Sequence, residues 1–122
     1  MDRRAVVRAV GVLSCLTFLG GVFVGGAQPE AAGLIPAPWD KLAHVVSFGL
    51  LTFMLDLALR PPVWLLAALP LSVSALDEFH QAFLPGRYAS LEDWLAGALG
   101  VALACWLLRG TRLREVVTAL RE

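Results

Sequence analysis

The ionisable side chains that could do chemistry are concentrated in one short stretch of the chain. Residues 77–87 read Asp-Glu-Phe-His-Gln-Ala-Phe-Leu-Pro-Gly-Arg, directly after a run from Val63 to Leu76 that is apolar apart from two serines and a proline. An acid at the end of such a run is costly where water is scarce, so an ionisable residue in a membrane segment indicates a site with a partner. The stretch therefore predicts a functional site at one end of a membrane-embedded helix.

Further polar residues lie on either side of this stretch, and their spacing places them on helix faces. Asp40 and His44 are four residues apart, with Lys41 between them, and Asp93 opens a later apolar segment. Residues four apart share one face of a helix, so we expect these groups to gather in one pocket. The candidate binding residues are Asp40, Lys41, His44, Asp77, Glu78, His80, Gln81, Arg87 and Asp93.

The composition indicates that these residues are positioned by membrane helices. Of the 122 residues, 58% are hydrophobic and 16% are charged, which does not describe a soluble domain. A helix needs about 20 apolar residues to cross the hydrocarbon core. The four candidate segments lie near 5–26, 41–59, 63–83 and 91–108. The predicted fold is all-α, an integral membrane bundle of four transmembrane helices in one domain over residues 1–122, with a cytoplasmic amphipathic tail over 109–122.

The first segment and the two cysteines were open to other interpretations. Arg3 and Arg4 before the first segment, and the small residues at 25–27 after it, also suit a secretory signal, although the apolar run is longer than a typical signal core. Cys15 and Cys105 lie in apolar runs without a CxxC or Cys/His spacing, which argues against a zinc or redox site. We predict a retained first span, buried free thiols, and no metal or cofactor.

The distribution of Lys and Arg predicts the orientation of the bundle. Short cytoplasmic loops carry an excess of basic residues. With four spans, only Lys41 and Arg87 fall on one side of the membrane. The eight on the opposite side are Arg3, Arg4, Arg8, Arg60, Arg109, Arg112, Arg114 and Arg121. Both termini are therefore predicted to be cytoplasmic, and the polar pocket to face outward.

Small residues predict where the helices approach one another closely. The small-xxx-small pattern occurs at Ala96, Gly100 and Ala104, and a similar notch at Gly21 and Gly25. These stripes also offer surfaces for a homo-oligomer. At the opposite end from the pocket, we expect Asp56 to pair with Arg60, four residues further along the same helix.

Several candidate residues also have a simple structural explanation. Ser90-Leu91-Glu92-Asp93 fits a capping box, in which Asp93 answers Ser90 at the start of a helix. Of the adjacent Asp77 and Glu78, at most one need face the bundle interior, and the other can extend to the headgroups. His80 can be a polar side chain at the membrane interface with no direct role in the site.

Four ordered motifs resemble the VanZ-like membrane protein family. They are Asp40-Lys41-Leu42-Ala43-His44 with Phe48, Asp77-Glu78-Phe79-His80-Gln81, Pro85-Gly86-Arg87 with Ala89-Ser90, and Asp93-Trp94-Leu95-Ala96. The resemblance implies a small multi-span helical protein of the bacterial cytoplasmic membrane. The family is named for a protein associated with low-level resistance to the glycopeptide teicoplanin. Its members usually carry an asparagine where this chain has Gly97, so any chemistry that needs that amide is in doubt here.

Three functions from different classes fit the residues. The first is a pocket that binds an anionic lipid-linked or cell-wall-precursor group, with Arg87, Lys41 and His44 as donors. The second is a membrane-embedded hydrolase for a phosphoester or amide, in which His44 and acids act directly or hold a divalent metal. The third is a purely structural polar network. The expected partners are membrane lipids and a lipid-linked wall precursor, and the zero net charge argues against nucleic acid.

Overall fold

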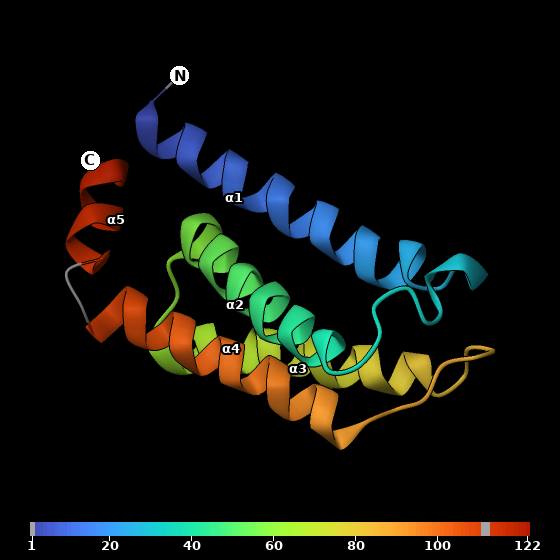
Figure 1. The fold of residues 1–122 in the computed structure, drawn as a ribbon. Coiled ribbons are helices and arrows are strands. Elements are labelled where there is room, and N and C mark those ends of the chain that lie inside the picture. The colour runs from blue at the N-terminus through green and yellow to red at the C-terminus, as the bar shows by residue number, and fades with distance from the viewer. Residues whose placement is uncertain (1, 111–112) are drawn as a thin grey trace.

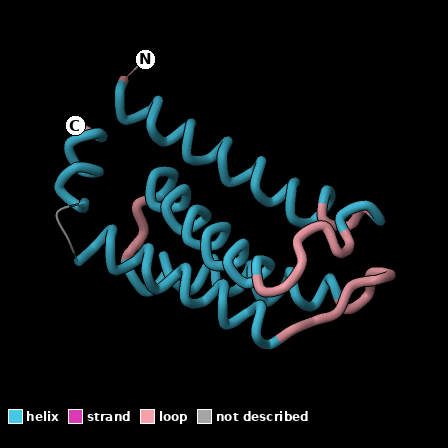
Figure 2. Tube along the Cα trace, viewed as in Figure 1, coloured by secondary structure: helices cyan, strands magenta, loops and turns pink. Residues whose placement is uncertain are grey.

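The computed structural model describes residues 2–110 and 113–122 of the chain, and these residues form an all-helical bundle (Figures 1 and 2). The α-helices of this described part are α1 (Arg3–Gly20), α2 (Trp39–Leu59), α3 (Val63–Gln81), α4 (Leu91–Gly110) and α5 (Leu113–Arg121). α1 continues into a π-helical turn over Gly21–Gly25, and a short 3-10 helix over Pro29–Ala31 lies in the loop before α2.

Three helical segments are long and apolar enough to cross a membrane. They are Arg3–Gly25, Trp39–Leu59 and Leu91–Gly110, which correspond to the first, second and fourth predicted spans. The third predicted span forms α3, which ends at Gln81 and carries the buried acids Asp77 and Glu78 in its last turns. The chain is thus a helical multi-pass membrane protein with three apolar spans and one helix of mixed character.

Prolines and a left-handed residue set the short connection between α2 and α3. α2 ends at Leu59 because Arg60 adopts a left-handed conformation, with φ at 46°, and two prolines follow it. Pro62 directly precedes α3, where its missing N–H costs no helical hydrogen bond. So short a connection makes the two helices antiparallel. The start of α2 therefore lies at the same end of the bundle as the end of α3.

α2 and α4 pack backbone to backbone through glycines. A Cβ on Gly49 would lie 3.3 Å from the carbonyl oxygen of Gly100, and a Cβ on Gly100 would overlap the carbonyl oxygen of Val45. The predicted stripe of α4 therefore faces α2, with Gly100 and Ala104 buried. Only glycine at Gly100 allows this approach.

The predicted glycine notch of α1 was wrong. A Cβ on Gly21 or Gly25 would meet no atom of the described residues within 4 Å, whereas a Cβ on Gly11 would lie 2.5 Å from the backbone nitrogen of Ala58. α1 thus approaches α2 at Gly11, about two turns from its own start. Along the same helix Cys15 is buried, and in α4 Cys105 is half-buried; both thiols are free.

The end of the bundle that holds the termini is tied by a different ion pair from the one predicted. Asp56 binds Arg109 of α4, with 2.6 Å between its Oδ1 and the guanidinium, and the side chain of Arg60 donates instead to the hydroxyl of Thr118 in α5. The left-handed backbone of Arg60 turns its side chain away from the last helical turn of α2, which removes the expected i,i+4 geometry. Arg121 of α5 donates to the backbone carbonyl of Asp56.

The two ends of the bundle hold different segments of the chain. In Figure 1 the N- and C-termini lie at one end, and the loops over 26–38 and 82–90 lie at the other. The start of α2, the end of α3 and the start of α4 meet at this loop end. The fold therefore brings the three predicted polar motifs to one place.

Candidate functional site

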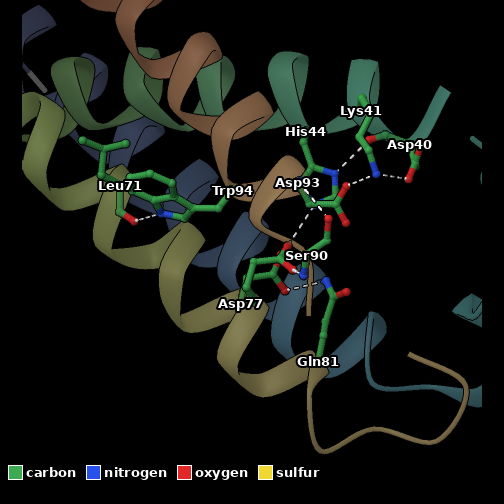
Figure 3. Close-up of polar contacts among 10 residues, drawn as sticks. Asp40, Lys41, His44, Leu71, Asp77, Gln81, Ser90, Asp93 and Trp94 are labelled. Carbon is green, nitrogen blue, oxygen red and sulfur yellow. Dashed lines mark hydrogen bonds and ion pairs between the residues drawn. The ribbon is translucent and has the colours of Figure 1, made fainter. Parts of the chain in front are cut away.

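Lys41 joins α2 to α4 at the loop end. Its Nζ lies 2.5 Å from Oδ1 of Asp93 and 2.9 Å from Oδ2 of Asp40 (Figure 3). The backbone N–H of Asp93 donates to the hydroxyl of Ser90 over 3.2 Å, so Ser90 caps α4 as predicted. The reciprocal half of the predicted capping box was wrong, because the backbone N–H of Ser90 donates to Glu78 and not to Asp93. The carboxylate of Asp93 contacts Lys41, a residue of another helix. Lys41 is therefore already engaged with two carboxylates.

The Nε2 atom of the His44 ring faces the acids of α3. Its Nδ1 lies 2.8 Å from the backbone carbonyl oxygen of Asp40, and its Nε2 lies 3.5 Å from Oε1 of Glu78. A carbonyl oxygen only accepts, so Nδ1 carries the hydrogen. Nε2 is therefore the atom that His44 offers to the interior of the site.

Asp77 and Glu78 are both buried, at 6% and 7% exposed. The expectation that at most one of them turns inward was therefore wrong. Glu78 Oε2 accepts a 2.8 Å hydrogen bond from the backbone N–H of Ser90, and Asp77 Oδ1 accepts one of 3.2 Å from Gln81 (Figure 3). The backbone just before α4 covers the last turn of α3 and supplies the donor that lets the second acid be buried.

Arg87 approaches from the turn after α3. One guanidinium nitrogen donates to the backbone carbonyl of Gly26 over 3.0 Å, and its buried Nε has no partner among the described residues. His80 packs against Phe23, with 5.6 Å between the ring centroids. Arg87 therefore belongs to the site, and His80 contributes a ring to its apolar wall.

Two adjoining cavities surround these side chains. The inner one, of about 170 Å³, is walled by Phe18 and Val22 of the first helical segment, and the outer one, of about 450 Å³, opens towards Leu34 and Tyr88. Both cavities are lined by Ala43, His44, Gln81 and Arg87. Of the candidate residues, Asp77 and His80 line the inner cavity, while Asp40, Lys41 and Asp93 line the outer one.

Sequence reasoning missed three contributors to this site. The backbone N–H of Ser90 and the carbonyl of Gly26 are main-chain groups, which no side-chain pattern reveals. The apolar wall of Phe18 and Val22 comes from a segment without charged residues near it. A useful signal was Ser90 itself, because a capping serine fixes the backbone that precedes the helix.

The arrangement offers one nitrogen and two carboxylates as metal ligands. His44, Asp77 and Glu78 each present a ligand atom, and these atoms lie within 4.8 Å of one another. Arg87 lines the inner cavity together with His44 and Asp77. The site thus combines a cation with unused donors, a cluster of acids with an imidazole, and apolar walls.

Comparison with known proteins identifies the family. The family model described as VanZ/LLP1 matches residues 8–114, a range that holds all nine candidate site residues. No curated protein and no solved structure matches the chain. Because the match spans most of the sequence and agrees with a helical membrane bundle, the chain belongs to the VanZ/LLP1 family.

Proposed function

We propose that this protein binds the phosphate-bearing headgroup of a lipid, of the class of lipid-linked cell-wall precursors, in the pocket at the loop end of the bundle. The observation that carries the proposal is the state of Arg87. Its Nε is buried without a partner among the described residues, while only one guanidinium nitrogen is bonded, to Gly26. A buried donor without a partner is costly. An oxyanion in the cavity would satisfy it, since the guanidinium fork binds phosphate bidentately.

Lys41 is not the cation that receives the ligand. It is shared between Asp40 and Asp93, at 2.9 and 2.5 Å. An incoming phosphate would have to displace a carboxylate from it. Arg87, bonded only to a neutral carbonyl, is the basic group at this end with donors to spare. In this proposal Arg87 is the phosphate donor, and Lys41 links α2 to α4.

The surroundings of the pocket suit a lipid. Leu34, 73% exposed, and Tyr88, 84% exposed, line the outer cavity, and Phe83, 72% exposed, lies in the loop that follows α3. Aromatic and aliphatic side chains at this level favour the boundary between headgroups and acyl chains. A lipid headgroup near Arg87 would leave its chain against these residues.

The orientation that the proposal needs is a four-span one. α3 has 19 residues, or about 28 Å at roughly 1.5 Å per residue, which approaches the thickness of the hydrocarbon core. Its two acids are buried in the bundle, so they do not oppose a crossing. Seven of the described arginines lie at the end that holds the termini, and this excess of positive charge supports a cytoplasmic location for that end. The pocket then faces outward, where wall precursors are used, and the family's association with teicoplanin resistance agrees.

The experiment is native mass spectrometry and titration of the purified full-length protein with an undecaprenyl diphosphate-linked precursor, with phosphatidylglycerol as a second probe. Arg87→Ala should weaken precursor binding by about 1.5–3 kcal/mol, or roughly 10- to 150-fold. Arg87→Lys keeps the charge but loses the fork, and should recover only part of the affinity.

Arg114→Ala is the matched control, because Arg114 is exposed and lies at the end that holds the termini. It should bind precursor as the unaltered protein does. Equal precursor affinity of Arg87→Ala and Arg114→Ala would refute the proposal. Tighter binding of phosphatidylglycerol than of the diphosphate would assign the pocket to ordinary membrane lipid.

A further inference from the structure

The geometry around His44 leaves three ligand atoms pointing at one small volume. Nε2 of His44 and Oε1 of Glu78 are 3.5 Å apart, and a carboxylate oxygen of Asp77 lies within 4.8 Å of both. Two ligands about 2.1 Å from a tetrahedral Zn²⁺ are roughly 3.4 Å apart. The His44–Glu78 pair already has this separation.

The tautomer of His44 requires a positive charge between its Nε2 and the carboxylate of Glu78. Because Nδ1–H donates to the carbonyl of Asp40, a neutral ring turns the lone pair of Nε2 towards the carboxylate of Glu78. Two lone pairs facing each other repel, so a positive charge must stand between them. It is supplied either by a proton on Nε2 or by a metal ion. In metal sites the second ring nitrogen is commonly held by a backbone carbonyl in this way, which fixes the ring and the tautomer.

The environment of Glu78 is a second, independent indication of a metal ligand. Its side chain is 9% exposed, Oε2 accepts from the backbone of Ser90, and Oε1 accepts no hydrogen bond from any residue that the structure describes. Asp77 is held likewise by Gln81. Each of the three side chains is thus fixed by one outer contact and presents a remaining atom to the centre.

The charges at this end are not balanced by the chain itself. Among the residues that the structure describes at this site, two permanent cations, Lys41 and Arg87, face the four carboxylates of Asp40, Asp77, Glu78 and Asp93. A proton on His44 leaves one carboxylate without a counter-charge. A divalent cation with neutral His44 balances all four. Buried charge without compensation is strongly disfavoured, more so at the end of a membrane helix.

We propose that His44 Nε2, Asp77 and Glu78 bind one divalent metal ion of the Zn²⁺ or Mn²⁺ class. The imidazole nitrogen disfavours Mg²⁺ and Ca²⁺, which prefer oxygen ligands throughout. Three protein ligands leave a coordination position open towards the cavity that Arg87 also lines. Metal binding itself does not depend on the lipid. A corollary is that the metal ion and Arg87 contact the same phosphate of the lipid headgroup from opposite sides. This corollary alone rests on the proposed function.

The test uses the full-length protein in detergent, stripped with a chelator and titrated with Zn²⁺ alone, without added precursor. We expect one Zn²⁺ per chain by elemental analysis. Glu78→Gln keeps the shape and the contact to Ser90 but removes the charge. It should lower Zn²⁺ affinity by more than the about 10- to 100-fold that loss of an outer contact costs. Glu92→Gln, an exposed acid at the start of α4, is the control and should bind Zn²⁺ normally.

A second readout needs no variant of the site. The chain has two histidines, so ¹⁵N spectra of histidine-labelled protein should show one ring whose Nε2 signal shifts on Zn²⁺ addition while its Nδ1–H is retained. Substoichiometric Zn²⁺, or unchanged histidine spectra, would overturn the proposal and leave His44 and Glu78 as a protonated ion pair. Because no lipid is present, this result is separate from failure of precursor binding.

Discussion

Removing the charge of Lys41 tests whether the α2–α4 ion pair holds the site end of the bundle together. In Lys41→Met the side chain of Asp93, 11% exposed, loses a cation at 2.5 Å, and Asp40 loses its own contact. Breaking a buried pair costs about 3–5 kcal/mol. Because Lys41 is 32% exposed and water can reach its partners, we expect Lys41→Met to destabilise the protein by clearly less than this.

The assay is a double-mutant cycle of Lys41→Met and Asp93→Asn, measured by reversible unfolding in detergent or bicelles. Asp93→Asn leaves Lys41 its bond to Asp40 and should cost about 1 kcal/mol, as for one hydrogen bond. The double variant has no uncompensated charge at Asp93, so it should be more stable than the sum of the singles predicts, by about 1 kcal/mol or more. Additivity of the two losses within about 0.5 kcal/mol would refute the inference that the pair is coupled.

Two further predictions concern packing and orientation. Gly100→Ala should destabilise the protein by about 1–3 kcal/mol, because the new Cβ overlaps the carbonyl oxygen of Val45, whereas Gly25→Ala should change stability by less than about 0.5 kcal/mol; equal effects in unfolding experiments would contradict the packing. If the pocket faces outward, the exposed side chain of Tyr88→Cys should react with a membrane-impermeant maleimide on intact cells, and Glu115→Cys should react only after lysis. Labelling of Glu115→Cys on intact cells, with Tyr88→Cys reacting only after lysis, would show the opposite orientation.

Much of the fold was predictable because it depends on local properties of the sequence. Long apolar runs bounded by prolines and glycines specify α1, α2 and α4 to within a few residues. The gathering of His44 with Glu78 followed from placing each motif at a helix end, since consecutive antiparallel helices return to the same end.

The choice of partners was harder to predict because it depends on how the helices rotate and on the backbone. Asp56 pairs with Arg109 although Arg60 is four residues away, since a left-handed residue ends the helix there. Gly21 and Gly25 permit a close approach, yet nothing in α1 requires a neighbour at that level, and Gly11 makes the contact. Small residues show where a helix can pack closely, but they do not identify the neighbouring helix.

The contacts between α2 and α4 share one register along the whole length of these helices. Lys41 meets Asp93 at a separation of 52 residues, and Asp56 meets Arg109 at 53. Between them Gly49 lies against Gly100. Sliding one helix by a turn, about 5.4 Å, would break both ion pairs together and push a side chain into the glycine contact. The two helices therefore form one rigid unit. Opening of the pocket for a large headgroup would then require movement of the π-helical turn and of the loop at Gly26, to whose carbonyl Arg87 donates a hydrogen bond.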